Sequence, residues 1–513
     1  MEKAGMKVNR LTDVLWEIPA VEKKGGFKMN VPARFYATEK LFKELDDGAV
    51  EQITNVACLP GIQEYAIAMP DAHFGYGMPV GGVAVFDLKE GVISPGGIGF
   101  DINCGMRFIR TELSFEDVKP KIKELTNELF RLVPAGVSCK GLIRFTEKEL
   151  REVMTEGAKW CVGQGYGFEN DFRKIESSGM IRNADPSKVS KKAVTRGVGQ
   201  LGTLGSGNHY LEVQVINKDS IFDLETAKAF GMEKEGQIGV MVHCGSRGFG
   251  HQICTDYLGS FDQAMKKYSI TLPDRQLACA PFESEEGQDY FKAMACASNF
   301  AFANRQMITH QIREAFKKVF HQSPEKLGLD VVYDVGHNTA KIEEYKVQGK
   351  RKKLIVHRKG ATRAFGPGND DLPPEYSKTG QPVIIGGSME TGSYLLAGTK
   401  EAEEESFGST CHGSGRTMSR AKAKNQVRGE TLQRDMEEKG IYVKAASMPG
   451  LAEEAGFAYK DLEQVVDTLE IAGITKRVVK MSPIANVKGA MNPTSALVPL
   501  LVAIIFGLLS QLL

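Results

Sequence analysis

The sequence lacks several patterns that mark whole classes of protein. Its nine cysteines include no close Cys-x-x-Cys pair, which argues against a disulfide framework or a zinc ribbon and fits a reducing cytoplasm. The first thirty residues are charged throughout and contain no apolar run, so no signal peptide is expected. The net charge of +1 gives no general basic field. A polyanionic partner would therefore need a local patch of basic residues.

Composition and periodicity indicate a large globular protein with both helices and strands. Hydrophobic residues make up 42% and charged residues 25% of the chain, as in ordinary globular domains. Apolar residues at helical spacing predict helices at residues 119–133, 299–319 and 458–472. Strand-like runs occupy residues 80–86, 238–243, 329–335, 354–357 and 383–385.

The fold class expected from this alternation is α/β (mixed α+β), with a central β structure flanked by helices. Several strand-like runs end directly at a histidine or glycine loop, where α/β folds usually place their chemistry. The candidate functional loops run from residue 71 to residue 488, with no internal repeat or low-complexity linker between them. We therefore expect residues 1–489 to form one interwoven domain.

The end of the chain, residues 490–513, is predicted to be a hydrophobic extension of unknown role. Residues 496–513 contain no charge, and these 18 residues are near the lower limit of a membrane span, roughly 17 to 25 residues. Three interpretations stay open: a tail anchor, a helix packed on the protein or a partner, and an added segment without a role. Membrane association is not expected unless the tail is an anchor.

The most informative segment is Ser409–Arg416, which reads STCHGSGR and places His412 beside a Gly-x-Gly turn and an arginine. Glycines let the backbone approach a ligand closely, and arginine suits phosphate oxygens. A neutral imidazole here is a candidate nucleophile toward phosphorus, a general base or a metal ligand.

Five more side chains with metal-ligand chemistry lie in glycine-rich loops: Asp101, Cys104, His209, His243 and His337. Each has a plain structural alternative, such as a buried cysteine or a histidine at a strand end. Together they are hard to explain as packing. A thiolate beside a carboxylate favours a borderline cation such as Mn²⁺ or Zn²⁺ over Mg²⁺. The sequence thus predicts a metal-assisted nucleotidyl-transfer site.

Basic residues gather in three runs, any one of which is equally typical of a solvated face. Placed on both sides of His412, they favour a nucleic-acid channel, in which phosphate contacts supply most of the affinity. The runs comprise Lys350, Arg351, Lys352, Lys353, Arg358 and Lys359; Arg416, Arg420, Lys422, Lys424 and Arg428; and Lys476, Arg477, Lys480 and Lys488.

Seven long motifs then occur in order along the chain: PDAHFGYG, SPGGIGFDINCG, QLGTLGSGNH, VHCGSRGFGHQ, YDVGHN, VHRKGATRAF and STCHGSGR, followed by a final VKG. With them, the chain from about residue 10 to residue 489 resembles the RtcB-type RNA ligases. The resemblance implies a cytoplasmic enzyme that joins RNA 3′-phosphate or 2′,3′-cyclic phosphate ends to 5′-hydroxyl ends. It further implies GTP and two Mn²⁺ ions as cofactors and a guanylylated histidine. The resemblance also implies an RNA-(3′)pp(5′)G intermediate and roles in tRNA splicing and RNA repair. The implied partners are RNAs such as tRNA exon halves and broken RNA ends, and an archease-type activator stays open.

The resemblance also assigns roles to single residues. Cys104 would bridge the two ions, with Asp101 and His209 completing one site and His243 and His337 the other.

For the nucleotide and the RNA, the resemblance implies that His412 takes GMP, that Asp71 is essential, and that Arg247 contacts RNA. We expect Asp71 to orient His412. The implied guanylate contacts are Asn208, Glu212, Asn338, Ser388, Gly413, Gly415, Arg416, Tyr459 and Lys488.

Three departures from the family pattern bear on this function. Glu390 stands where glycine is usual and places a carboxylate near the expected nucleotide pocket. Ser482 replaces a common arginine, and residues follow Gly489, so that Lys488 is not penultimate.

Two alternative functions stay open: an Mn²⁺-dependent RNA cyclic phosphodiesterase or phosphatase without nucleotidylation, and an RNA-binding scaffold.

Overall fold

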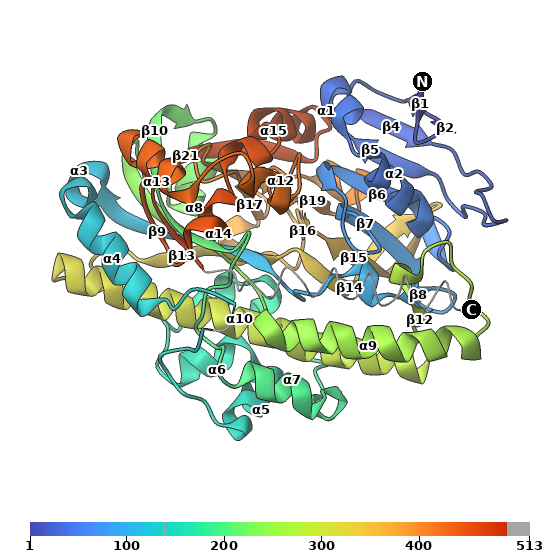
Figure 1. Ribbon diagram of the computed structural model, residues 1–513, viewed down its shortest axis with the longest axis horizontal. Coiled ribbons are helices and arrows are strands. Elements are labelled where there is room, and N and C mark those ends of the chain that lie inside the picture. Colours follow the sequence, from blue (N-terminus) through green and yellow to red (C-terminus); the bar gives the residue numbers. More distant parts are fainter. Residues whose placement is uncertain (138, 490–513) are drawn as a thin grey trace.

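The computed structural model describes residues 1–137 and 139–489, and it contains two large sheets flanked by helices (Figure 1). The prediction for residues 490–513 lies outside the described residues. The first sheet runs β13 (Asp330–Gly336), β9 (Gly105–Ser114), β11 (Gln237–Cys244), β10 (Tyr210–Ile221), β21 (Thr475–Lys488), β18 (Ser393–Gly398) and β17 (Pro382–Gly386), with β20 (Tyr442–Ala445) beside β21. The second runs β14 (Asn338–Val347), β15 (Lys350–Lys359), β7 (Val80–Asp87), β6 (Ile62–His73), β5 (Ala33–Tyr36), β4 (Leu15–Ile18) and β3 (Asn9–Arg10).

Three short ladders and a set of helices complete the described structure. The ladders pair β1 (Glu2–Lys3) with β2 (Met6–Lys7), β8 (Val92–Ile93) with β12 (Ala280–Pro281), and β16 (Ala361–Arg363) with β19 (Ser409–Cys411). The helices are α1 (Glu39–Glu44), α2 (Asp47–Val56), α3 (Phe115–Val118), α4 (Ile122–Leu132), α5 (Glu147–Glu156), α6 (Ala158–Gly163), α7 (Lys191–Gly197), α8 (Leu224–Phe230), α9 (Arg247–Lys267), α10 (Glu285–Phe320), α11 (Lys400–Glu405), α12 (Arg420–Lys424), α13 (Gly429–Glu438), α14 (Met448–Ala452) and α15 (Leu462–Ile471).

The predicted α/β class is confirmed, and the predicted elements correspond to α4, α10, α15 and to β7, β11, β13, β15 and β17. The main difference is the length of α10. Its 36 residues begin at Glu285, fourteen residues before the predicted helix. The hydroxyl of Ser284 caps this start by accepting a hydrogen bond from the Gly287 amide. The added part, residues 285–298, reads EEGQDYFKAMACAS and begins with mostly polar residues, so it leaves little apolar periodicity to detect.

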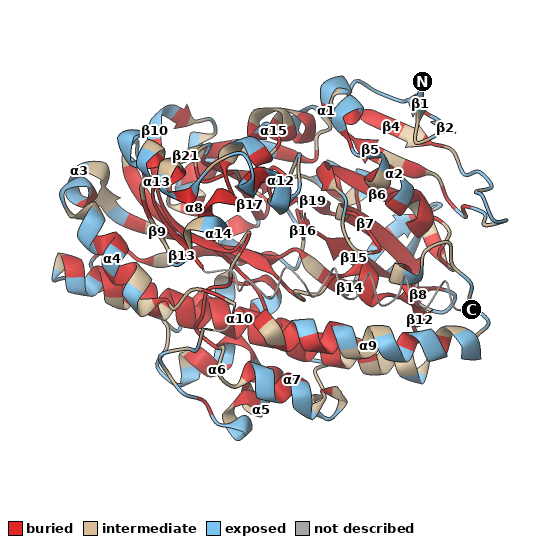
Figure 2. Cartoon of the chain, viewed as in Figure 1, coloured by how far each residue is buried: buried red, intermediate tan, exposed pale blue. Residues whose placement is uncertain are grey.

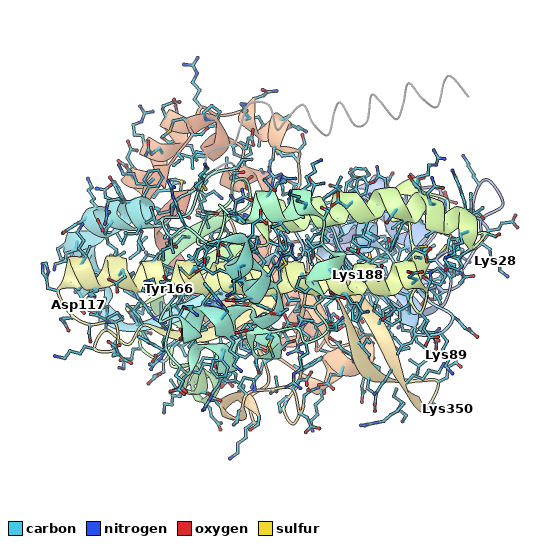
Figure 3. The ribbon with its side chains drawn as sticks, turned by 90° about the horizontal axis from the view of Figure 1, so that it is seen from below. Lys28, Lys89, Asp117, Tyr166, Lys188 and Lys350 are labelled. Carbon is cyan, nitrogen blue, oxygen red and sulfur yellow. The ribbon has the colours of Figure 1, made fainter. Side chains whose placement is uncertain are left out.

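Helix α10 spans about 54 Å at 1.5 Å per residue and lies along one side of both sheets. It is buried along most of its length (Figure 2). Seen from below, α9 runs beside it, and Lys350 marks the far tip of the β14–β15 hairpin (Figure 3). The inner face of α10 packs on residues of β9, β10 and β11 in one apolar cluster. This long helix is therefore the common support of loops that are distant in sequence.

Polar side chains of α10 hold three of those loops directly. The side-chain amide of Asn304 donates to the Thr203 and Gly245 carbonyls, both at 3.1 Å. The Arg305 guanidinium donates to the Asn103 and Cys244 carbonyls, both at 2.8 Å. Buried carbonyls need hydrogen-bond partners. These contacts supply such partners and also fix the positions of the loops.

The strand register of the first sheet brings the candidate residues to one edge. Tyr210 lies opposite both His243 and Lys488, and Gly105 lies opposite both Cys244 and Gly336. Antiparallel neighbours alternate in direction, so β9 and β10 begin at this edge while β11, β13 and β21 end there. Loops from five strands therefore meet at one place.

In residues 1–137 and 139–489, no helix combines the length and the apolar composition that a membrane span requires.

A buried ion cluster anchors α10 to the first sheet and yields a stability prediction. Asp334 of β13 accepts hydrogen bonds from Arg107 at 2.6 Å and from Arg305 at 2.8 Å, and all three side chains are fully buried. Asp334→Ala leaves two buried guanidinium groups without their carboxylate, so we expect a loss of about 3–5 kcal/mol in the free energy of unfolding. Denaturant titration measures it.

The matched control is Asp330→Ala on the same strand, because Asp330 pairs with Arg110 in a solvent-accessible bridge. It should cost less than about 1 kcal/mol. Equal effects of the two substitutions would contradict this role for the buried cluster.

Candidate functional site

His412 directly follows β19, which pairs with β16 in a short ladder between the two large sheets. Its Nδ1 lies 2.8 Å from Asp71 Oδ2 and 2.8 Å from the Gly360 carbonyl. Both partners are acceptors, so Nδ1 carries the proton and donates. In the neutral ring Nε2 is then the nitrogen with the lone pair, and His412 lines the central cavity. The arrangement leaves one imidazole lone pair available for chemistry.

Asp71 is completely buried on β6 and contacts His412 twice, through the ring and through the backbone amide at 3.3 Å. Gly415 makes this approach possible. A Cβ at Gly415 would lie 2.2 Å from the Asp71 carbonyl, and the residue has a φ of +73°, a conformation that glycine adopts without strain. The structure thus places Asp71 directly against the histidine.

Two groups of donor atoms converge beside His412 and share Cys104 Sγ. The first is Asp101, Cys104 and His209, and the second is Cys104, His243 and His337, with the ligand atoms of each group within 4.8 Å of one another. Cys104 Sγ lies 3.2 Å from His209 Nε2 and 3.2 Å from His243 Nε2. The five residues that the sequence suggests as ligands are therefore brought together.

The donor set has the properties of a site for soft to borderline divalent cations. His243 Nε2 and His337 Nε2 face each other at 3.2 Å, and burial holds the pKa of both imidazoles well below the usual value, so they are neutral. Burial raises the pKa of the Cys104 thiol to about 12, with Asp101 adding to the effect. A bound cation would reverse that shift, because it stabilises the thiolate. The residues fit a metal centre.

All of these donor residues except His209 line a cavity of about 630 Å³. The rings of His337 and His412 lie 4.4 Å apart between centroids, which joins the donor cluster to the candidate nucleophile. The sequence-predicted residues that line the cavity are Asp101, Cys104, Asn208, His243, His337, Asn338, His412, Gly413, Gly415, Arg416 and Tyr459.

Three of the predicted guanylate contacts lie behind this lining. Lys488, the last residue of β21, is buried and donates to the Gly207 carbonyl at 3.1 Å. Burial raises the pKa of the Glu212 carboxyl to about 7, although Gln214 and Lys488 oppose the shift. Ser388 accepts from the amides of Glu390 and Thr391 and shapes its own turn. Strand pairing keeps Lys488 in place although the chain continues beyond it.

One wall of the cavity depends on a residue that no motif indicates. The Glu454 carboxylate pairs with Arg420 at 2.9 Å and with Arg416 at 3.3 Å, and it accepts a hydrogen bond from the Tyr459 hydroxyl. The Arg416 guanidinium lies 5.0 Å from the Tyr459 ring centroid. Glu454 thereby holds two cations and one aromatic ring in a fixed relation.

The prediction that the first basic run lines a nucleic-acid channel is wrong for Arg358, which is absent from the cavity lining, whereas Lys359 does line the cavity. Arg358 is buried and pairs with Glu343 at 2.7 Å. Arg363 is buried over the Phe365 ring. The buried Lys359 ammonium donates to the carbonyls of residues 76 and 96. These cations stabilise the interior, because a buried charge requires partners.

Arg247 is also less exposed than we would expect of an arginine that contacts RNA on an open face. Its guanidinium donates to the Gly136 carbonyl at 2.6 Å and to Thr203 Oγ1 at 3.1 Å. A Cβ at Gly205 would lie 2.7 Å from Arg247 Nη1 and 1.9 Å from His209 Nδ1. Glycine at position 205 is therefore required for the loop to pass over both side chains.

Neither of the two substitutions, Glu390 and Ser482, belongs to the cavity lining. The Glu390 carboxylate accepts from Lys439 at 2.8 Å and from the Gly456 amide at 3.1 Å, and it is absent from the cavity lining. Ser482 Oγ accepts from the side-chain amide of Asn217 at 2.5 Å in a solvent-exposed contact.

Comparison with known proteins adds a finding to this geometry. Residues 52–489 match the model of the family described as tRNA-splicing ligase RtcB. A tRNA-splicing ligase RtcB of Archaeoglobus fulgidus is 56% identical over 482 residues, which cover 94% of this chain and 99% of that protein. The protein of the same name from Methanococcus maripaludis is 53% identical with the same coverage. RNA-splicing ligase RtcB homolog 1 of Entamoeba dispar is 48% identical over 91% of this chain and 89% of its own length.

The shared sulfur predicts how metal binding responds to substitution. Cys104→Ser should weaken both sites by more than about 10-fold, the lower end of the effect of even indirect metal partners. His337→Ala should weaken only one. Isothermal titration of the metal-free protein with MnCl₂ measures this, with the buried Cys254→Ser on α9 as the control. Unchanged affinity in Cys104→Ser would exclude the shared-sulfur arrangement.

A buried carboxylate behind His337 predicts a pH dependence of stability. Glu176 accepts from the Gly336 amide at 2.8 Å and pairs with Lys341 at 2.8 Å. Burial alone would raise its pKa, but the charges of Lys341 and Arg363 lower it to about 2, from 4.5. The resulting stability is present above pH 4.5 and is lost as the pH falls toward 2.

We therefore expect the free energy of unfolding of wild type to exceed that of Glu176→Gln above pH 5, and the gap to close toward pH 2. Urea titrations at stepped pH measure the gap. Glu344→Gln, at a solvent-accessible ion pair with Arg351, should show almost none. A gap that stays constant with pH would rule out this source of stability.

Proposed function

Because this chain belongs to the RtcB family of tRNA-splicing ligases, we propose that it is an RNA ligase that uses GTP and two Mn²⁺ ions. It joins RNA 3′-phosphate or 2′,3′-cyclic phosphate ends to 5′-hydroxyl ends through a guanylylated His412 and an RNA-(3′)pp(5′)G intermediate. Its partners are tRNA exon halves and broken RNA ends in the cytoplasm, together with an archease-type activator.

The observation that carries the proposal is the fixed tautomer of His412. Asp71 and the Gly360 carbonyl both accept from Nδ1–H, which leaves the Nε2 lone pair on the cavity side as a nucleophile. Asp71 also stabilises the positive charge that the imidazole acquires when it attacks, as the buried aspartate of a catalytic triad does. Its complete burial strengthens that interaction.

In the first step, His412 Nε2 attacks the α-phosphorus of GTP. A P–N bond forms, the bond from the α-phosphorus to the bridging oxygen breaks, and pyrophosphate leaves. A 2′,3′-cyclic phosphate is first opened by water, which breaks the bond from phosphorus to the 2′-oxygen and leaves a 3′-phosphate. An oxygen of the RNA 3′-phosphate then takes the GMP group and frees the imidazole. The RNA 5′-hydroxyl attacks the activated phosphate, loses its proton and releases GMP.

The surrounding side chains divide the work of charge stabilisation. Arg416 and Arg420, held by Glu454, supply cations for phosphate oxygens on one wall. Asp101, Cys104, His209, His243 and His337 would hold the Mn²⁺ ions, which when bound offset charge on the phosphoryl oxygens and hold the reacting groups in line.

The test is covalent labelling with α-³²P-GTP and MnCl₂. We expect wild type to carry label that is lost in acid and survives alkali, as a phosphoramidate does, and His412→Ala to carry none. Asp71→Asn should label at least about 100-fold more slowly, because it cannot support the charged imidazole equally well. His310→Ala, on α10 and outside the cavity, should label normally.

Two results would contradict the proposal. An unlabelled wild type that still opens 2′,3′-cyclic phosphate would favour the phosphodiesterase alternative. An unlabelled wild type that binds RNA without turnover would favour the scaffold.

A further inference from the structure

Three segments of the chain lie side by side at the cavity, and backbone hydrogen bonds join them. The middle segment begins with His412. It pairs with the first segment through the bridge between Gly386 and Gly413. It pairs with the third segment through the bridge between Arg416 and Tyr459. The three segments are residues 386–391, 412–417 and 456–460. Several of the implied guanylate contacts therefore depend on one set of backbone pairings.

The side chain of Glu390 joins the first segment directly to the third. Its Oε1 accepts a hydrogen bond from the Gly456 amide at 3.1 Å, where the third segment begins. A Cβ at Gly456 would lie 2.8 Å from that oxygen and 3.2 Å from Ser388 Oγ. A side chain at position 456 would therefore push the carboxylate away. With this bond, each of the three segments is joined to the other two.

The turn that carries Glu390 is itself held in place. Met389 is buried against α13 in a small apolar cluster, which fixes the backbone next to Glu390. Lys439, which follows α13, donates to Glu390 Oε2 at 2.8 Å. Only 22% of the Glu390 side chain is exposed. A carboxylate that is already ordered by its surroundings loses little further side-chain entropy when it binds an amide.

The position of Glu390 also decides which effect its charge has on a nucleotide. A free carboxylate close to phosphate groups would repel them. Glu390 does not line the cavity, and the Lys439 ammonium offsets its charge. The glycine that is usual at this position in the family has no side chain that could reach the Gly456 amide. The bond is therefore an addition that this chain makes to the common arrangement.

We propose that Glu390 is a positioning residue for the nucleotide, which keeps the three segments in the arrangement that binds GTP. The inference rests on the proposed function, because GTP is the ligand concerned. A site that is already ordered loses less conformational entropy when its ligand binds, so it binds that ligand more tightly. Loss of the bond weakens GTP binding and leaves the chemical step unchanged once GTP is bound.

The first test measures how the rate of His412 labelling depends on GTP concentration. Glu390→Ala should raise the GTP concentration at half-maximal rate by about 2- to 30-fold, the range for side chains that act on a site without touching its ligand. The maximal rate should not change. Alanine is used because glycine would also loosen the backbone.

Two matched variants separate the bond to Gly456 from the ion pair with Lys439. Glu390→Gln keeps an acceptor for the Gly456 amide and should restore most of the affinity for GTP. Lys439→Met removes the ion pair but leaves the bond to Gly456, so it should behave like wild type. An unchanged GTP requirement in Glu390→Ala, a lower maximal rate, or an equal loss of affinity in Lys439→Met would each overturn the inference.

Hydrogen exchange of the nucleotide-free protein separates this inference from the proposed function. Glu390→Ala should speed the exchange of backbone amides in residues 412–417 and 456–460, whereas Lys439→Met should not, and peptides of α10 should exchange as in wild type. This result is expected even if wild type proves unable to bind GTP, a failure that would count against the proposed function alone. Unchanged exchange in both segments of Glu390→Ala would overturn the inference.

Discussion

The site depends on a single buried guanidinium. Arg305 of α10 binds Asp334 on one side and the carbonyls of Asn103 and Cys244 on the other. These two carbonyls belong to loops that present Cys104 and His243. An arginine can make these bonds at once because its five N–H groups form a planar fork. The distance between the shared thiol and its neighbouring imidazole is therefore set by the helix that supports both loops.

The second requirement is that two separate sheets deliver their residues to one point. The first sheet supplies the donor cluster along one edge, and the second supplies Asp71 through β6. His412 arrives on the short β16–β19 ladder between them. Asp71 then joins the two parts by its bonds to the His412 ring and amide. His412 is thus oriented by one sheet and placed beside the candidate metal ligands held by the other.

The sequence predicts the content of this site better than its surroundings. Motif residues such as His412 and Cys104 stand out because glycine-flanked polar side chains have little reason to exist in a plain core. The partners of these residues do not stand out: Glu454 and Glu176 look like ordinary surface glutamates until the fold buries them. Basic residues mislead in the opposite way, since Arg358 reads as part of a channel but neutralises Glu343 in the interior. Which side of a strand faces a core is a tertiary property that a charge pattern does not contain.

We propose that His412 Nε2 is the atom that becomes nucleotidylated. Mass spectrometry of the tryptic peptide of residues 401–416, prepared at alkaline pH after incubation with GTP and MnCl₂, tests it directly. We expect the added mass of one GMP, located on His412 by fragmentation. The same mass located on a lysine, or an unmodified peptide from a protein that still ligates RNA, would contradict it.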